Sequence, residues 1–175
     1  MTTPFVPPPG MIGLTQISGS VGKTIEFGQW LNGEGFECWE HAFVVLPDGQ
    51  ILEAEPGPDG AVISPVTRYS NVYWCENVFK LLPQPRPSDA RITEIANQLK
   101  GTPYSFADYA ALAAHRLHIW APFLKTYVQT SKHEICSQLA DDFYQRLGVP
   151  IFTDGRWNGD VTPGSLFRRD LELGL

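Results

Sequence analysis

Two short apolar runs separated by a tight-turn sequence form the clearest pattern along this chain. The first run is Ala42-Phe43-Val44-Val45-Leu46 and the second is Gln50-Ile51-Leu52-Glu53-Ala54-Glu55, with Pro47-Asp48-Gly49 between them. A Pro-Asp-Gly sequence between such runs is a strong signal for a β-hairpin. A three-residue loop, with a type I turn and a bulge at Gly49, would pair Leu46 with Gln50.

The register of this hairpin decides which side chains share a face. With the three-residue loop, His41 faces Glu55 and Phe43 faces Glu53, and because strand side chains alternate, both acids lie on the His41 face. A two-residue loop would instead move both acids to the other face. Solvated acids beside the loop are the alternative interpretation.

Other segments predict a sheet followed by helices. Further short strands are expected over 11–14, 62–66 and 72–82, and helices near 25–31 and over 89–100, 106–118 and 134–147. Ser88 is a good N-cap for the helix over 89–100, and Gly101 ends it. The tail through Thr162-Pro163-Gly164 is expected to be loop.

The helix over 134–147 has the most regular pattern. Ile135, Leu139, Phe143 and Leu147 recur every four residues and form one buried stripe, while Asp141-Asp142 is expected on the solvated face. Strands first and helices later predict an α+β fold with a central antiparallel sheet and this helix packed against it.

Length and composition agree with one folded unit. The chain has 175 residues, of which 43% are hydrophobic and 18% charged, and this size suits a single domain. Residues 1–10 hold four prolines and are expected to form an extended arm, with the domain over 11–175. The net charge is −6 without a basic block, so nucleic acid and broadly anionic membranes are not expected partners.

No apolar run is long enough for a transmembrane helix, and the N-terminus lacks the basic start and apolar stretch of a Sec signal peptide. The expected location is therefore cytoplasmic, or phage-encoded and virion-associated. Three cysteines, Cys38, Cys75 and Cys136, do not make a disulfide framework. No metal or organic cofactor is expected.

Cys136 is the strongest candidate for a reactive group. It lies in the first turn of the predicted helix over 134–147, where free backbone N–H groups and the helix dipole favour a thiolate. A small buried residue on an amphipathic helix is the alternative. His41, at the start of a strand, is a candidate base, and either Glu53 or Glu55 could orient its imidazole, which completes a Cys/His/carboxylate set.

Other candidates are weaker. Cys38 lies three residues before His41, but two ligands do not make a metal site. His115 and His118 share a face of a predicted helix and are interpreted as surface residues. His133 and Lys132 precede Cys136 and are interpreted as loop and solvated residues.

Four short motifs resemble those of the circularly permuted NlpC-type papain-like cysteine hydrolases, the YiiX/YaeF-like branch. The hairpin from His41 to Ala54 resembles the family's "H-x-G-I-x-x…G-x-V-I-E-A", and Gly101-Thr102-Pro103-Tyr104 resembles its "G-x-x-Y-D". Ile135-Cys136-Ser137-Gln138-Leu139-Ala140 resembles "Y-C-S-E-L-V", and Val161–Leu166 resembles the closing "x-P-x-D-L". The motifs follow the family order over roughly residues 11–167, with His41 before Cys136 as in permuted members.

The resemblance implies roles for particular residues. Cys136 would be the nucleophile, His41 the base and Glu53 the orienting acid, with Glu55 as the alternative acid and Tyr104 near the substrate cleft. The chain departs from the family at three places. Ala42-Phe43 replaces a small Gly beside the histidine, Gln138 replaces the common Glu, and Ser105 replaces the Asp after the tyrosine. None of these changes removes a catalytic group.

The resemblance also implies a substrate class. Family members include peptidoglycan peptidases, lipid-directed acyltransferases and thioesterases, so a peptide or acyl-containing small molecule, including cell-wall fragments, is expected. The expected activity is that of a cysteine amidase or peptidase acting through a thioacyl-enzyme. A non-catalytic binding or structural module on the same scaffold is the main alternative, and a metal-dependent hydrolase using Cys38 and His41 is another. The oligomeric state stays open.

Overall fold

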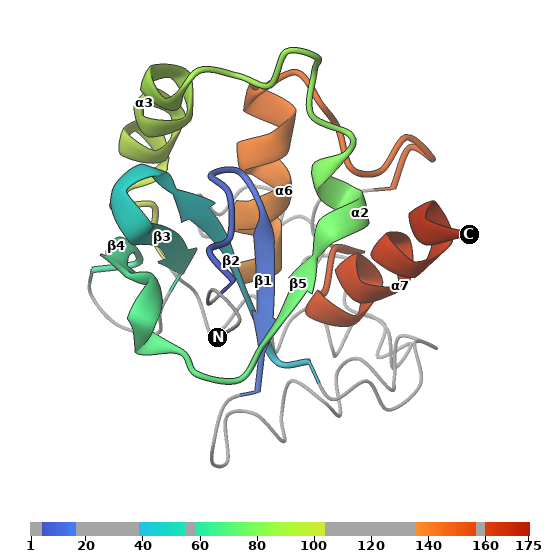
Figure 1. Cartoon of the computed structure of the whole chain (residues 1–175), viewed down its shortest axis with the longest axis horizontal. Helices are drawn as coiled ribbons and strands as arrows, with labels where there is room; N and C mark the ends of the chain where they lie inside the picture. The colour runs from blue at the N-terminus through green and yellow to red at the C-terminus, as the bar shows by residue number, and fades with distance from the viewer. Residues whose placement is uncertain (1–4, 17–38, 55–58, 104–135, 157–159) are drawn as a thin grey trace, which may run out of the picture.

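Five antiparallel strands form the sheet of this protein in the computed structural model, which describes residues 5–16, 39–54, 59–103, 136–156 and 160–175 (Figure 1). The order across the sheet is β4-β3-β2-β1-β5. The strands are β1 (Ile12–Thr15), β2 (His41–Leu46), β3 (Gln50–Ala54), β4 (Ala61–Pro65) and β5 (Val72–Cys75). The expected helices near 25–31 and over 106–118 lie outside the described residues.

The β2–β3 hairpin has the predicted register. Leu46 pairs with Gln50 and Phe43 pairs with Glu53 across a three-residue loop, Pro47–Gly49. The turn inside the loop is not the expected type I turn, because Asp48 has φ 61° and Gly49 has φ 67°. Asp tolerates this left-handed conformation better than most residues, so the loop length holds while the turn type changes.

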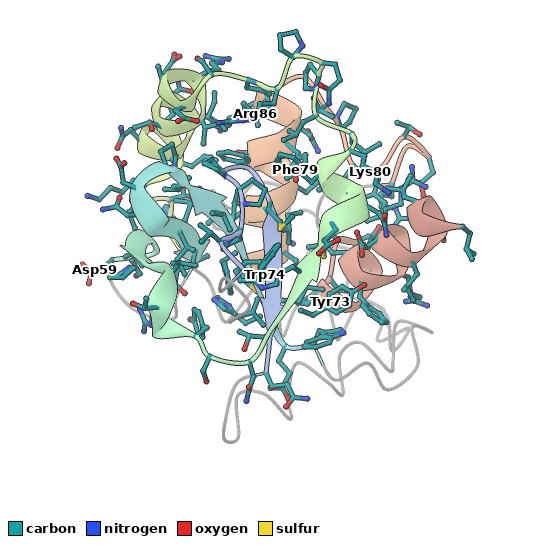
Figure 2. The ribbon with its side chains drawn as sticks, viewed as in Figure 1. Asp59, Tyr73, Trp74, Phe79, Lys80 and Arg86 are labelled. Atoms are coloured by element: carbon teal, nitrogen blue, oxygen red, sulfur yellow. The ribbon has the colours of Figure 1, made fainter. Side chains whose placement is uncertain are left out.

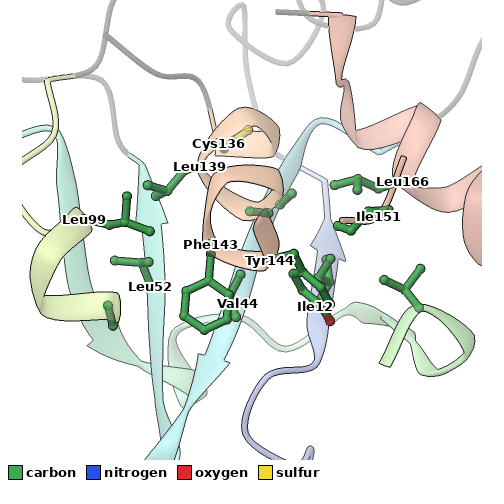
Figure 3. Packing of buried hydrophobic residues seen from close by; sticks show 14 of the residues in the cluster. Ile12, Val44, Leu52, Leu99, Cys136, Leu139, Phe143, Tyr144, Ile151 and Leu166 are labelled. Atoms are coloured by element: carbon green, nitrogen blue, oxygen red, sulfur yellow. The ribbon is translucent and has the colours of Figure 1, made fainter. Parts of the chain in front are cut away.

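Helix α6 (Cys136–Arg146) packs on one face of the sheet, against β2 and β3, with α3 (Asp89–Leu99) beside it. Figure 3 shows Phe143 of α6 between Val44 and Leu52 of these strands. Ser88 caps α3 as expected, because its side chain accepts a hydrogen bond from Arg91 N at 3.2 Å.

The buried surface of α6 is wider than the predicted stripe. Leu139 and Phe143 are buried as expected, but Asp141 is also only 3% exposed, so its placement on a solvated face was wrong. Its Oδ2 accepts a hydrogen bond from Gln145, while Oδ1 has no partner within the described residues. Asp142 does reach the surface, where it pairs with Arg146 at 2.9 Å.

The loop predicted through Thr162-Pro163-Gly164 ends earlier than expected, because a helix begins at Pro163. Helix α7 (Pro163–Gly174) begins directly after Thr162, whose side chain accepts a hydrogen bond from Ser165 N at 3.0 Å. Ser165 Oγ accepts one from Thr162 N at 2.9 Å, which completes a reciprocal capping pair. A threonine followed by proline is a helix-start signal, so the prediction of loop at Pro163-Gly164 was wrong.

The strand expected over 72–82 ends at Cys75 because a short helix, α2 (Glu76–Phe79), begins there. Asp170 of α7 accepts hydrogen bonds from the backbone N–H groups of Asn77 and Val78, at 2.7 and 2.9 Å. A carboxylate from another helix thus satisfies the free donors at the start of α2. This contact joins residues more than 90 positions apart, so the local pattern could not reveal it.

The chain between β4 and β5 crosses from one edge of the sheet to the other (Figure 1). It comprises a 3₁₀ turn, Val66–Arg68, and the residues up to Asn71, whose carbonyl accepts a hydrogen bond from Thr15 Oγ1 at 3.0 Å. Val66 and Tyr69 pack on the side chains of Phe43, Val45 and Ile51. This crossing segment, residues 66–71, therefore covers the sheet face opposite to α6.

The described N-terminal residues join the sheet at Gly10. Gly10 N donates to Val45 O at 2.7 Å, and the Tyr144 hydroxyl of α6 donates to Gly10 O at 2.6 Å.

Among the described helices, none is long and apolar enough to span a membrane.

Candidate active site

His41 and Glu53 form a buried pair at one end of the sheet. The cross-strand partner of Glu53 is Phe43, so His41 is the diagonal neighbour of Glu53, two residues away on the same face. His41 Nε2 lies 3.0 Å from Glu53 Oε2, and the two side chains are 5% and 0% exposed. The register of the hairpin thus brings the two side chains into contact.

The carboxylate determines which imidazole nitrogen carries hydrogen. An ionised carboxylate only accepts hydrogen bonds, so His41 Nε2–H donates to Glu53 Oε2. Nδ1 is then the nitrogen left to exchange a proton with another group. The Cys136 side chain also interacts with this imidazole, and the interaction raises the pKa of His41.

Cys136 is the first described residue of α6 (Figure 3). Ser137, the next residue, anchors this end of the helix because its hydroxyl donates to Val161 O at 2.7 Å. His41 is the first residue of β2, at the strand end, where its imidazole contacts both Glu53 and the start of α6. The described structure thus brings Cys136, His41 and Glu53 into one chain of side-chain contacts.

The charges in this chain of contacts reinforce one another. Burial by itself lowers the pKa of His41, but the interactions of the imidazole with Cys136 and with Glu53 outweigh burial and raise the pKa to about 9. Burial by itself raises the pKa of Glu53, but hydrogen bonds from His41, Tyr69 and Ser64 hold that pKa below its usual value. At neutral pH the site therefore contains an imidazolium beside an ionised carboxylate.

Glu53 has more donors than His41 alone. The Tyr69 hydroxyl donates to Oε2 at 2.6 Å, and Arg68 Nη1 donates to Oε1 at 3.2 Å. Arg68 also donates to Ser64 Oγ at 3.3 Å, and Ser64 helps to lower the pKa of Glu53. Sequence reasoning missed all three residues.

A signal existed for only one of these three. Ser64 lies on the same face of β4 as Val62, the cross-strand partner of Glu53, so alternation along a correctly paired strand would have found it. Arg68 and Tyr69 reach Glu53 only because the crossing segment runs back over the hairpin. No local pattern indicates that path.

Several predicted residues lie outside the described part of the chain. These are Glu55, the alternative acid, Tyr104, the expected cleft residue, and Cys38, Lys132, His115, His118 and His133. Phe43, the departure from the family's small residue, packs against Tyr69 and over Gly13 in the described structure.

A second buried cluster lies around Asp170 and provides a useful comparison. The Tyr73 hydroxyl reaches toward α7 and donates to Asp170 Oδ2 at 2.9 Å (Figure 2). Burial and the charge of Asp170 raise the pKa of the nearby Cys75 thiol well above its usual value. Cys75 is thus a buried, unactivated thiol.

Within residues 5–16, 39–54, 59–103, 136–156 and 160–175, no group of three His, Cys, Asp or Glu side chains has the arrangement of a metal site. No protein-family model matches the chain, and no curated protein matches it in sequence. The chemical interpretation of the site therefore rests on its geometry and its electrostatics.

Proposed function

We propose that this protein is a cysteine hydrolase in which Cys136 is the nucleophile, His41 the general base and acid, and Glu53 the orienting carboxylate. The observation that carries the proposal is the buried His41 imidazole, which lies 3.0 Å from Glu53 Oε2 and whose pKa is also raised by the Cys136 side chain of α6. A thiol, an imidazole and a carboxylate in this order are the parts that activate a nucleophile for acyl transfer.

The reaction follows from the charges. In the reactive form His41 already holds the proton that the Cys136 thiol has given up, and the Cys136 thiolate attacks the carbonyl carbon of an amide or ester. The imidazolium then protonates the leaving amine or alcohol as its bond to that carbon breaks, which leaves a thioester. His41 next accepts a proton from water, hydroxide attacks the thioester, and the carbon–sulfur bond breaks to release the acid.

The N-terminal end of α6 supplies the groups that stabilise the oxyanion of the reaction. Backbone N–H groups in the first turn of a helix have no partner within the helix and carry partial positive charge. Cys136 lies at the N-terminal end of the described part of α6, and we assign its N–H to stabilise the oxyanion that develops beside its sulfur.

The order of elements supports a permuted NlpC-type papain-like fold. The strands that carry His41 and Glu53 precede the helix that carries Cys136, as in the permuted members that the sequence motifs resemble. The proposed activity is that of an amidase or peptidase, with peptidoglycan-type peptides or acyl amides and esters as the substrate class. A binding module is less favoured, because burying a charged imidazole–carboxylate pair costs solvation free energy that binding alone does not require.

Alkylation located by mass spectrometry tests the proposal. Iodoacetamide at pH 6 should label Cys136 at least about tenfold faster than Cys75, because a buried thiol with a raised pKa stays protonated there. The Cys136→Ser variant should fold and should lose turnover of any acyl or peptide probe that labels the wild-type protein.

The controls separate the alternatives. Cys75→Ser should keep probe turnover, and His41→Gln should slow labelling at Cys136. Equally slow labelling of Cys136 and Cys75 would favour the binding module and would exclude the proposed enzyme.

A further inference from the structure

One oxygen of Glu53 is shared between the His41 imidazole and a tyrosine hydroxyl. Tyr69 donates to Oε2 at 2.6 Å, and His41 Nε2–H donates to the same atom at 3.0 Å. Two donors on one oxygen divide its negative charge between them. The strength of the Glu53–His41 hydrogen bond therefore depends on Tyr69.

The position of the Tyr69 hydroxyl is determined by the packing of its ring. The ring stacks on Phe43, with centroids 5.1 Å apart and planes at 12°, and its centroid lies 5.5 Å from that of His41. Phe43 in turn lies over Gly13, where an added Cβ would come within 2.4 Å of the Phe43 ring. The absence of a side chain at Gly13 leaves room for the Phe43 ring, which stacks on Tyr69.

The backbone of Tyr69 is held by the path of the chain. The crossing segment connects β4 and β5 at opposite edges of the sheet, and it is fastened near its end by the hydrogen bond from Thr15 Oγ1 to Asn71 O. Val66 and Val72, on either side of Tyr69, pack on the same apolar cluster. Ring and backbone together leave the hydroxyl little freedom to leave Glu53.

We propose that Tyr69 is a positioning residue of the Cys136–His41–Glu53 set, which orients the Glu53 carboxylate and limits how strongly its charge acts on His41. This inference rests on the proposed function for its catalytic meaning. Tyr69 acts on the reaction only through Glu53 and His41, and it makes the imidazolium a better proton donor than Glu53 alone would allow.

The charged and titratable groups facing this pair come from three parts of the fold. Among the described residues they are Cys136 at the start of α6, Glu53 on β3, and Arg68 and Tyr69 on the crossing segment. Arg68 bonds the other oxygen, Oε1, and its side chain is 44% exposed, so solvent weakens its effect. The Tyr69 hydroxyl is the donor that competes directly with His41 for Oε2.

The test is an NMR titration of the His41 ring in wild-type protein and in Tyr69→Phe, with the signal assigned by its absence in His41→Gln. Phenylalanine keeps the ring stack and removes only the hydroxyl. The whole charge of Oε2 then acts on the imidazolium, so the titration midpoint of His41 should rise by roughly half a pH unit or more.

Tyr73→Phe is the matched control. It removes the same hydroxyl from a similar pair, Tyr73 and the buried Asp170, which includes neither His41 nor Glu53. Its His41 midpoint should equal that of the wild-type protein, although both variants should lose some stability. A His41 midpoint that stays or falls in Tyr69→Phe, or that rises equally in Tyr73→Phe, would overturn the proposal.

Iodoacetamide labelling of Cys136 in the same proteins separates the two hypotheses. Slow labelling of wild-type Cys136 would contradict the proposed enzymatic activity, while the His41 titration would still decide whether Tyr69 controls the Glu53–His41 pair. Fast labelling together with an unchanged His41 midpoint in Tyr69→Phe would support the proposed activity and contradict the role of Tyr69.

Discussion

Glu53 connects residues from several parts of the site through the hydrogen bonds that its carboxylate accepts. Its buried carboxylate accepts hydrogen bonds from His41, Tyr69 and Arg68, and these bonds offset the cost of burying a charge. The lowered pKa of Glu53 keeps it ionised throughout the neutral range. Its negative charge can therefore stabilise the His41 imidazolium during a reaction.

Replacing Glu53 by glutamine should remove this charge while preserving side-chain shape. We expect Glu53→Gln to lower probe turnover by about a thousandfold, because a neutral amide neither stabilises the imidazolium nor enforces the Nε2–H tautomer. Turnover at pH 7 measures the effect, and circular dichroism checks folding.

Glu55→Gln is the comparison for this experiment, since both acids were candidates from the sequence. Its turnover should stay within about threefold of the wild-type value if Glu53 is the orienting acid. Small and equal losses in the two variants would contradict the role assigned to Glu53 and leave the imidazole without a carboxylate partner from this hairpin.

Helix α7 links several elements that are distant in sequence. Asp170 bonds the start of α2 and the Tyr73 hydroxyl, while Val161, just before α7, accepts the hydrogen bond from Ser137 beside Cys136. The start of α7 thus connects to the start of α6, where the proposed nucleophile lies. The Thr162–Ser165 capping pair holds this end of α7 in the interior.

Breaking that capping pair should destabilise the protein measurably. We expect Thr162→Ala to lower the free energy of unfolding by about 1–2 kcal/mol, because the buried Ser165 N–H would lose its acceptor and water could not replace it. Urea unfolding followed by circular dichroism measures the change.

Ser88→Ala removes the more accessible cap of α3 and is the matched comparison, with an expected loss of about 1 kcal/mol or less. If Thr162→Ala cost no more than Ser88→Ala, the buried capping pair would contribute less to the fold than its geometry indicates.

The two faces of the sheet pack against different parts of the structure. Val44 and Leu52 face α6 and the larger apolar core, while Phe43, Val45 and Ile51 face the crossing segment. His41 and Glu53 lie on the second face at the strand ends, so the site forms where sheet, crossing segment and α6 meet. Ionisation of this site is therefore linked to the stability of the entire chain.

The sign of that linkage follows from His41. Its pKa rises from 6.5 to about 9 on folding, so protonation of His41 stabilises the folded state fully below pH 6.5, and this stabilisation is lost as the pH rises through 9. The free energy of unfolding should fall between pH 7 and pH 10 by up to about 3 kcal/mol more in the wild-type protein than in His41→Gln.

Urea unfolding of both proteins at pH 6, 7, 9 and 10 measures this difference. Comparing the change with pH, rather than the absolute stability, removes the cost of the substitution itself. Parallel pH profiles for the two proteins would show that His41 does not gain affinity for its proton on folding.

Several features of the fold and site follow from short stretches of sequence. The Pro47–Gly49 loop predicted the hairpin register, which the structure confirms and which places Glu53 beside His41. The spacing of Leu139 and Phe143 predicted the buried side of α6, and Ser88 predicted the start of α3. The strand predicted over 72–82 begins at Val72 but is too long, because α2 begins at Glu76 and Asp170 binds its first N–H groups. The loop predicted at Pro163-Gly164 was wrong, because Thr162 caps α7 there.

Turn lengths, caps and apolar spacing act over a few residues, so the sequence alone determined the hairpin, the face shared by His41 and Glu53, and the helix that carries Cys136 near its N-terminal end. Only the tertiary structure decided that Cys136 meets His41 across nearly a hundred residues of chain, and that Tyr69 and Arg68 close over Glu53. These contacts depend on the order of strands and the path of the crossing segment. That order is selected by burial of apolar surface over the whole fold, which no local pattern of residues encodes.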